Sequence, residues 1–297
     1  MSRPREIIAN RTYLVTRRCT HRQFLLRPDD ATNNAFVYCL AVAAQRTNVD
    51  VVFTCAMSNH HHTVVHDHDG RLPEFMEHFH KLLAKCQNVW RRRLENFWDP
   101  AKASAVRLLD ADDVFAKIVY AATNPVKDFL VERAHQWPGV NGYSALVRDE
   151  PMTATRPRYF FNPDGDMPEF VSLPLVMPAH LGTSAAAVAR VVAAVAEVEA
   201  TVLATRRQTG RGVLGRKAVL AQSWQEAPRS VAPRRTMNPL LAARDKWRRI
   251  ETLLQTKHFL LQYRRALDAM AACVPIPFPP GTYWLKRFLN IDVEAYL

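Results

Sequence analysis

The chain has 297 residues, of which 48% are hydrophobic, enough to bury the core of one large or two modest domains. Forty Lys and Arg against 28 Asp and Glu give a formal charge of +12, which favours a polyanionic partner such as nucleic acid. No apolar run approaches the roughly 18 residues that span a bilayer, and the N-terminus has no signal-peptide core. We therefore expect a cytoplasmic, nucleoid-associated protein and not a membrane or secreted one.

The first half of the chain alternates strand and helix patterns. Strands are indicated by β-branched and aromatic residues, and helices by apolar residues recurring at three and four. In chain order the patterns predict a strand at 12–16, a helix at 31–46, strands at 51–55 and 62–65 joined as a hairpin by the turn at 57–59, and a long amphipathic helix at 72–97.

The pattern continues with a short extended segment at 105–109 and a helix at 111–123. Asp110 can cap this helix, and Pro125 is expected to interrupt it. The turn-rich stretch 136–144 is expected to close the domain. This order predicts an α+β fold, a small antiparallel sheet with helices on one face, over residues 1–150.

Beyond residue 150 the composition changes. A proline-rich stretch at 151–178 precedes an alanine- and valine-rich helix at 184–205, a basic loop at 206–217 and a second helix at 239–272. Residues 151–297 are therefore expected to form an all-helical, basic accessory region that binds DNA.

A histidine run provides the strongest chemical signal. Side chains alternate across a strand, so His60 and His62 project from one face and His61 from the other. Two imidazoles on one face are a divalent-metal site that lacks a third ligand. Tyr120 and Asn124 are four residues apart and share one helix face, which makes Asn124 a candidate for that ligand and Tyr120 a neighbour of a metal-bound phosphate.

The strand Met-x-Asn-His-x-His, followed downstream by Tyr-x-x-x-Asn-Pro-Val on a helix, resembles the single-tyrosine HUH transposases, in particular the REP-associated tyrosine transposases. The resemblance covers roughly residues 8 to 150. One position departs from the family pattern, because His61 stands where an apolar residue is usual. The resemblance implies a ferredoxin-like or RRM-like antiparallel sheet, the HUH nuclease fold, followed here by the helical region.

The resemblance also implies a mechanism and partners. Tyr120 would attack a phosphodiester of single-stranded or hairpin DNA, leaving a 5′-phosphotyrosine, while His60, His62 and Asn124 hold Mg²⁺ or Mn²⁺. Cleavage followed by rejoining is the activity of a DNA transposase or strand transferase. No membrane partner is expected, and the family contains both monomers and homodimers.

Other interpretations of the same residues are open. The histidines could be solvent-facing strand residues, and His66 with His68 form a rival His-x-His pair beside a turn. At the level of function, the alternatives are an HUH replication initiator or relaxase-like nickase, and a domesticated DNA-binding repressor with an inactive site.

Basic and aromatic residues supply candidate DNA contacts. Arginines suit phosphate contacts, and Trp90, Trp98 or Tyr13 could stack an unpaired base. The lysines on either side of Tyr120 could hold a phosphate or could be solvated surface charges. The candidates for DNA binding are Arg17, Arg18, Arg91, Arg92, Arg93, Lys117, Lys127, Arg211 and Arg216.

Overall fold

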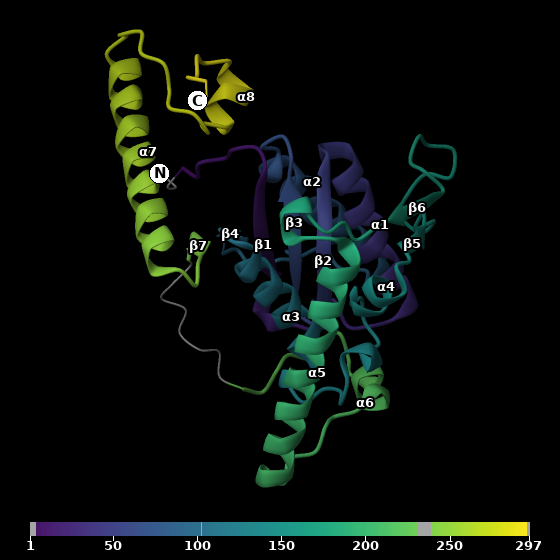
Figure 1. The fold of residues 1–297 in the computed structure, drawn as a ribbon. Helices are drawn as coiled ribbons and strands as arrows, with labels where there is room; N and C mark the ends of the chain where they lie inside the picture. The colour runs from purple at the N-terminus through teal and green to yellow at the C-terminus, as the bar shows by residue number, and fades with distance from the viewer. Residues whose placement is uncertain (1–3, 102, 231–238, 296–297) are drawn as a thin grey trace.

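A computed structural model describes residues 4–101, 103–230 and 239–295 of the chain, which form a five-stranded sheet flanked by helices (Figure 1). The strand order is β2-β3-β1-β4-β7, antiparallel except for the parallel pairing of β7 with β4. The expected α+β class is confirmed. The strands are β1 (Arg11–Arg18), β2 (Val49–Met57), β3 (His60–Asp67), β4 (Ser104–Leu108) and β7 (Leu241–Ala242).

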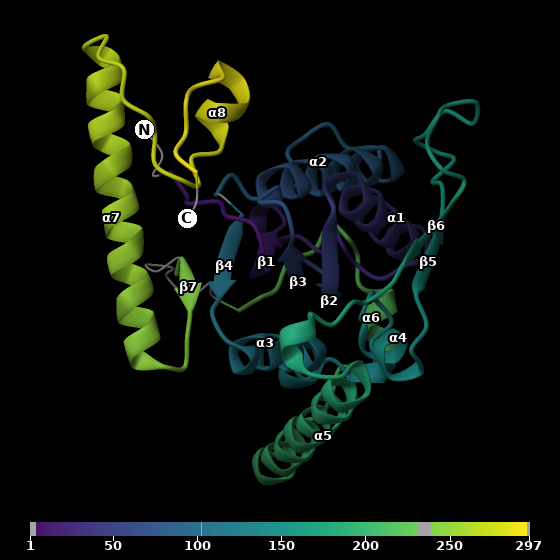
Figure 2. The ribbon, with the colours of Figure 1, turned by 45° about the horizontal axis from the view of Figure 1, so that its top comes forward.

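Different helices cover the two faces of the sheet. Helices α1 (Asp30–Thr47) and α2 (Leu72–Trp90) pack on one face, and α3 (Ala111–Lys127) packs on the other (Figure 2). The expectation that all helices share one face is wrong. Its physical reason is visible in β3, where Val64 and Val65 point to opposite faces and are both fully buried, so each face needs a covering layer.

Element boundaries follow local signals except where distant contacts override them. Helix α1 begins as expected, after Asp29, whose side chain accepts a hydrogen bond from the Thr32 backbone N–H at 2.7 Å. Helix α2 ends at residue 90 instead of 97, because Arg92 adopts a left-handed backbone with a φ of 51°. Helix α3 continues through Pro125 to Lys127, beyond the expected end at 123.

The second half of the chain is mainly helical but not all-helical. A two-stranded antiparallel sheet, β5 paired with β6, precedes the long helices in sequence, and β7 extends the main sheet. The elements not yet named are α4 (Tyr143–Arg148), β5 (Met152–Thr155), β6 (Phe170–Leu173), α5 (Ser184–Thr209), α6 (Arg216–Ala221), α7 (Lys246–Ala271), α8 (Trp284–Leu289) and the 3₁₀ helices Thr20–Arg22, Ala134–Gln136 and Ala179–Leu181.

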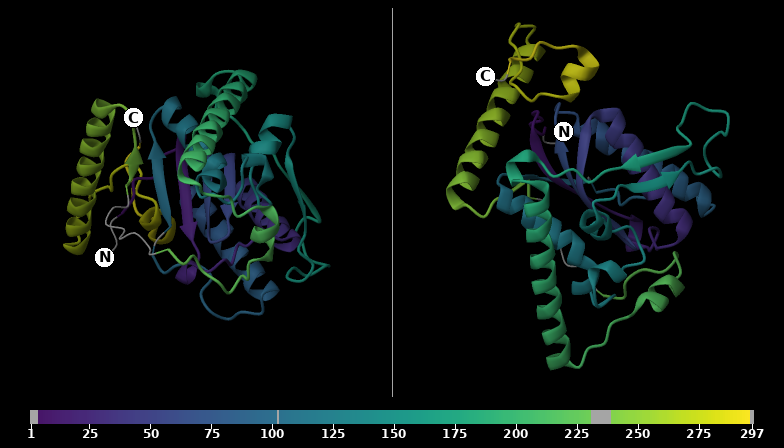
Figure 3. Two further views of the ribbon diagram at one scale, coloured as in Figure 1. Left: turned by 90° about the horizontal axis from the view of Figure 1, so that it is seen from below. Right: turned by 45° about the vertical axis from the view of Figure 1, so that its right-hand side comes forward.

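Residues past 150 complete the hydrophobic core. Leu173 of β6 joins the cluster on the α1 and α2 face, whereas Val191 and Val195 of α5 join the cluster around α3. The helix α7 stands beside the β7 edge of the sheet (Figures 1 and 3). The segment from 151 to 221 is therefore packed into the same body as the first half of the chain.

The turn-rich stretch after α3 covers the outer edge of β2. The Ala56 backbone N–H donates to the Val140 carbonyl at 2.8 Å, and the Gly142 N–H donates to the Thr54 carbonyl at 2.8 Å. Pairing of this kind protects a sheet edge from other chains. None of the helices among the described residues is long and apolar enough to span a membrane.

Candidate active site

The hairpin places two histidines on the sheet face that α3 covers. Strand β3 starts at His60, directly after the turn at Ser58 and Asn59, and the alternation of the strand turns His60 and His62 to the same side. Their ring centroids are 4.9 Å apart. The expected shared face of the pair is thus present.

Each of these rings is held through its Nδ1 atom by an oxygen. His60 Nδ1 lies 2.7 Å from Asn59 Oδ1, and His62 Nδ1 lies 2.9 Å from Thr16 Oγ1 on the neighbouring strand β1. Asn59 is itself oriented, since its amide nitrogen donates to the Arg22 carbonyl at 3.1 Å. Hydrogen bonds at Nδ1 fix the ring orientation and leave Nε2 as the nitrogen that can bind a metal.

The Asn59 and Thr16 contacts were not expected from the sequence. Asn59 belongs to the Met-x-Asn-His motif, so its position directly before His60 was the available signal. Thr16 becomes visible only through the strand register, which places it opposite His62.

Tyr120 comes to this face on α3. The helix starts at Asp110, whose backbone N–H donates to the Asp113 carboxylate at 3.3 Å, an N-terminal capping arrangement. The Tyr120 ring centroid lies 5.1 Å from that of His62, and the side chain is 39% exposed, so the phenol is accessible from solvent. A strand and a helix distant in sequence thereby bring the predicted nucleophile beside the histidine pair.

Asn124 follows one turn later on the same helix and is buried. The prediction that Pro125 ends the helix is wrong, because the chain retains helical geometry for two more residues and the Asp128 N–H still donates to the Asn124 carbonyl at 3.0 Å. Proline here forgoes only the one hydrogen bond that its own nitrogen would have donated.

Two lysines flank the tyrosine. The Nζ atoms of Lys117 and Lys127 lie 5.7 Å and 5.4 Å from the centroid of the Tyr120 ring. Desolvation, and secondly the charge of Lys117, lowers the pKa of Lys127. Both ammonium groups therefore stand close enough to the phenol to attract a phosphate that approaches it.

The donor set fits a divalent cation with open positions. Two imidazoles whose Nδ1 atoms are engaged, together with an amide oxygen one helical turn from Tyr120, match the nitrogen and oxygen ligands of Mn²⁺ or Mg²⁺. Among the residues that the structure describes, no group of three or more His, Cys, Asp or Glu side chains is arranged to hold a metal. The amide of Asn124 stays the expected third ligand, one helical turn from Tyr120.

His61 points to the opposite face, as the alternation predicts. Its ring is fully buried between the sheet and α2, where its Nε2 atom lies 3.0 Å from Nε2 of His80 and its Nδ1 lies 3.0 Å from Thr63 Oγ1. Burial lowers the pKa of His61 well below its usual value, and that of His80 likewise. The residue that departs from the family pattern is thus one half of a neutral buried histidine pair.

The rival pair has other partners. His66 Nδ1 lies 3.0 Å from Thr12 Oγ1, and His68 Nε2 lies 2.7 Å from the Asp50 carboxylate. The contact with Asp50 engages one of the two His68 ring nitrogens, so this pair is held differently from His60 and His62, which are both held at Nδ1.

The arginines at the end of β1 occupy two environments. Arg17 lies on the face away from Tyr120, with its guanidinium 5.3 Å from the Trp98 ring centroid. Arg18 is opposite His60 in the strand register and pairs with Asp99 at 2.6 Å. Arg18 and Arg93 also line a hollow of about 690 Å³ at this end of the sheet.

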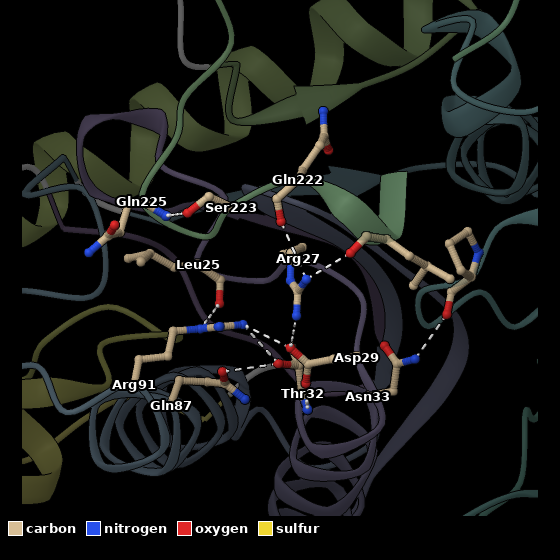
Figure 4. A network of polar contacts seen from close by, with 12 residues as sticks. Leu25, Arg27, Asp29, Thr32, Asn33, Gln87, Arg91, Gln222, Ser223 and Gln225 are labelled. Carbon is tan, nitrogen blue, oxygen red and sulfur yellow. Dashed lines mark hydrogen bonds and ion pairs between the residues drawn. The ribbon is translucent and has the colours of Figure 1, made fainter. Parts of the chain in front are cut away.

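Burial removes Arg91 from the residues that could reach a DNA phosphate in this structure. It is 7% exposed, and its guanidinium donates to the Leu25 carbonyl at 3.0 Å and to Thr32 Oγ1 at 2.9 Å (Figure 4). Asp29 accepts from it as well and also binds Arg27. Arg91 fastens the end of α2 to the start of α1.

Of the aromatic candidates for base stacking, two are buried and one is exposed. Tyr13 and Trp98 are 2% and 6% exposed and belong to the core. Trp90 is exposed, with its ring 5.1 Å from that of Tyr159. Of the remaining arginines, Arg92, Arg211 and Arg216 are exposed. Arg211 also lies over the Phe129 ring.

Two basic residues near Tyr120 were not expected from the sequence. Arg190 of α5 and Arg244, directly after β7, approach the start of α3, where Arg190 pairs with Asp112 at 2.6 Å and the Arg244 N–H donates to Asp113 at 2.9 Å. Nothing in the local sequence pattern around Asp112 and Asp113 pointed to partners this far along the chain.

No protein-family model and no curated protein matches the chain. Among solved structures, the chain is similar to a REP-associated tyrosine transposase bound to a REP hairpin, with a TM-score of 0.40 and 17% identity over 60% of this chain and 99% of that one. It is also similar to a candidate transposase from Deinococcus radiodurans R1, with a TM-score of 0.29 and 16% identity over 42% of this chain and 97% of that one.

Proposed function

We propose that the protein is a metal-dependent, single-tyrosine DNA transposase or strand transferase that cleaves and rejoins single-stranded DNA at hairpin elements. The observation that carries the proposal is the position of the Tyr120 ring 5.1 Å from the ring of His62, itself paired with His60. The hairpin as target comes from the family resemblance.

The reaction would proceed by transesterification. The Tyr120 hydroxyl loses its proton and its oxygen attacks the scissile phosphorus, so that a phosphotyrosine bond forms and the bond to the 3′-oxygen breaks. The 3′-oxygen takes up a proton and leaves as a free hydroxyl. Because the phosphodiester energy is kept in the phosphotyrosine, a new 3′-hydroxyl can reverse the step without ATP.

Each neighbouring side chain has a part in this scheme. His60, His62 and Asn124 would hold Mg²⁺ or Mn²⁺, which when bound supplies Lewis-acid polarisation of a phosphate oxygen. Asn59 and Thr16 orient the two imidazoles through their Nδ1 atoms. Lys117 and Lys127 place two positive charges around the phenol, where the negative charge of the phosphotyrosine would develop.

The proposal is tested by following a covalent protein–DNA adduct. Tyr120→Phe should abolish a denaturant-resistant adduct with single-stranded DNA from the flanks of the gene, while hairpin binding measured by fluorescence anisotropy stays within about twofold, because the missing hydroxyl performs chemistry. Tyr143→Phe is the matched control and should retain the adduct.

Two further variants address the metal. His60→Ala and His62→Ala should each eliminate the adduct and weaken Mn²⁺ binding measured by calorimetry. An adduct that persists in Tyr120→Phe would show that another residue is the nucleophile, and one that persists in both histidine variants would remove the metal site from this face.

A further inference from the structure

A cavity of about 320 Å³ opens beside Tyr120, between α3 and α5. This volume is within the range of small-ligand sites, roughly 300–1,000 Å³. Its walls come from both halves of the chain, because α3 supplies one side and residues beyond 150 supply the other. The lining residues are Asp112, Phe115, Ala116, Val119, Tyr120, Lys127, Arg190, Ala194 and Arg244.

The lining combines an apolar surface with cations. Phe115, Val119 and Ala194 provide apolar surface, whereas Lys127, Arg190 and Arg244 contribute positive charge. A nucleotide has the complementary division, with a flat base of low charge and a phosphate. An apolar cavity without cations could accept the base but would offer no favourable contact to the phosphate.

Arg190 is held in a fixed orientation within this cavity. Its guanidinium pairs with Asp112 at 2.6 Å and lies 4.1 Å from the centroid of the Phe115 ring, a cation–π contact. An arginine flattened against an aromatic ring presents a planar surface on which a base can stack.

Arg244 is positioned by its backbone. Its N–H donates to the Asp113 carboxylate at 2.9 Å, just after β7 has paired with β4. The side chain can therefore be replaced while the anchoring hydrogen bond is kept, which matters for the choice of variants below.

We propose that this cavity binds the nucleotide that remains attached to Tyr120 after cleavage, with its base against Phe115, Arg190 and Ala194. The inference rests on the proposed function, since it takes Tyr120 to be the nucleophile. Tyr120 itself lines the cavity, so the nucleotide whose 5′-phosphate it captures lies one bond away. Residues from the second half of the chain thereby hold the base on the 3′ side of the cleaved bond.

The test fills the cavity from α5. Ala194→Phe places a ring in the cavity, and Ala193→Phe, at an exposed position beside it that does not line the cavity, is the matched control. On a single-stranded oligonucleotide that forms the adduct, the rate should fall about 5- to 100-fold in Ala194→Phe, the size expected when one base no longer stacks. Ala193→Phe should keep the parental rate.

An abasic substitution identifies which nucleotide is bound. In the unmodified protein, removing the base immediately 3′ to the cleaved bond should slow adduct formation by a similar factor. In Ala194→Phe the same substitution should have little further effect, because the two changes remove the same interaction. Equal rates of adduct formation in Ala194→Phe and Ala193→Phe would overturn the inference. So would a non-additive effect of the abasic substitution at a different nucleotide.

Binding separates this inference from the proposed function. With Tyr120→Phe, which forms no adduct if the function is correct, an oligonucleotide with the intact base should bind more tightly than its abasic form, and Arg244→Ala should reduce this difference whereas Arg249→Ala should not. Base-dependent binding without any adduct in the parental protein would retain the cavity and refute the strand-transfer function. An adduct whose formation does not depend on the base would support the strand-transfer function and refute the proposed role of the cavity.

Discussion

At the scale of single residues, the site depends on contacts that set the direction of each imidazole. The proposed ligands His60 and His62 are held through their Nδ1 atoms by Asn59 and Thr16. Removal of such a partner typically costs 10- to 100-fold in metal affinity or activity, although the ligand itself remains.

Thr16→Val should therefore weaken Mn²⁺ binding and slow adduct formation by about 10- to 100-fold. The matched control is Thr12→Val, on the same strand, which removes the equivalent contact to His66. Calorimetric titration with Mn²⁺ and adduct kinetics measure the two effects. Equal effects in both variants would mean that the threonines support the strand and not the metal ligands.

At the scale of elements, the contact between β3 and α2 includes a polar pair inside an apolar core. His61 and His80 are both fully buried and hydrogen-bonded to each other, among Phe36, Phe79 and Trp98. A leucine at position 61 alone would leave the His80 nitrogen buried without that partner, at a cost of about 1–3 kcal/mol. His61→Leu is thus expected to preserve the active face but to lower stability.

The same pair predicts a pH dependence. Both pKa values are lowered by folding, so below about pH 6.5 the unfolded chain binds more protons than the folded protein, and stability falls as the pH decreases. Each histidine contributes a slope of up to about 1.4 kcal/mol per pH unit between its unfolded and folded pKa. Above about pH 7 this contribution is fully present.

Chemical denaturation between pH 5 and 8 measures this slope. The double variant His61→Leu/His80→Leu removes both titrating groups and should show a flatter dependence than the parent, while other histidines titrate in both proteins. Identical profiles would show that the pair does not control acid stability.

Local patterns predicted these elements where local forces decide them. The hairpin of β2 and β3 followed from alternation and a turn, and α1 from apolar spacing. The end of α2 did not follow, because the apolar spacing continues to Phe97 whereas the backbone turns left-handed at Arg92. Strand β7 has two residues and exists through its pairing with β4, which no short-range pattern encodes.

The residues of the candidate site likewise fall into those that local spacing identifies and those that depend on long-range contacts. Tyr120 and the histidine pair are identified by spacing, whereas Thr16, Arg190 and Arg244 depend on register and on packing between the two halves. The sequence suggests Arg91 as a DNA contact because it is an arginine in a basic run. Its burial, however, depends on the end of α2, the start of α1 and the segment around Leu25, which meet only in the fold.

At the scale of the whole molecule, the positive charge is distributed over both halves, and truncation is a poor way to test its purpose. A chain ending near residue 150 would lack Val191 and Val195 in the core around α3, so that unfolding and weaker DNA binding could not be told apart.

Charge substitutions at exposed positions test the DNA-binding expectation instead. Arg216→Gln/Lys217→Gln, at the start of α6, should reduce the slope of log affinity against log salt by about 0.7–0.9 for each phosphate that the protein no longer neutralises. The control for net charge is Arg148→Gln/Arg158→Gln, which also removes two positive charges at exposed positions outside α6. Anisotropy titrations at several salt concentrations provide the slopes. A slope unchanged by the α6 pair would assign those charges to solvated surface.

The start of α3 is fastened to the second half of the chain at three positions. Asp110 forms an ion pair with Arg248, Asp112 pairs with Arg190, and Asp113 accepts from the Arg244 backbone, 131 residues later in sequence. Contacts of such separation close late in folding, because the intervening chain must first be ordered. During synthesis, the helix that carries Tyr120 would therefore gain its final support only after residue 248 has left the ribosome. A nascent or prematurely terminated chain would present Tyr120 on a helix that lacks these three contacts.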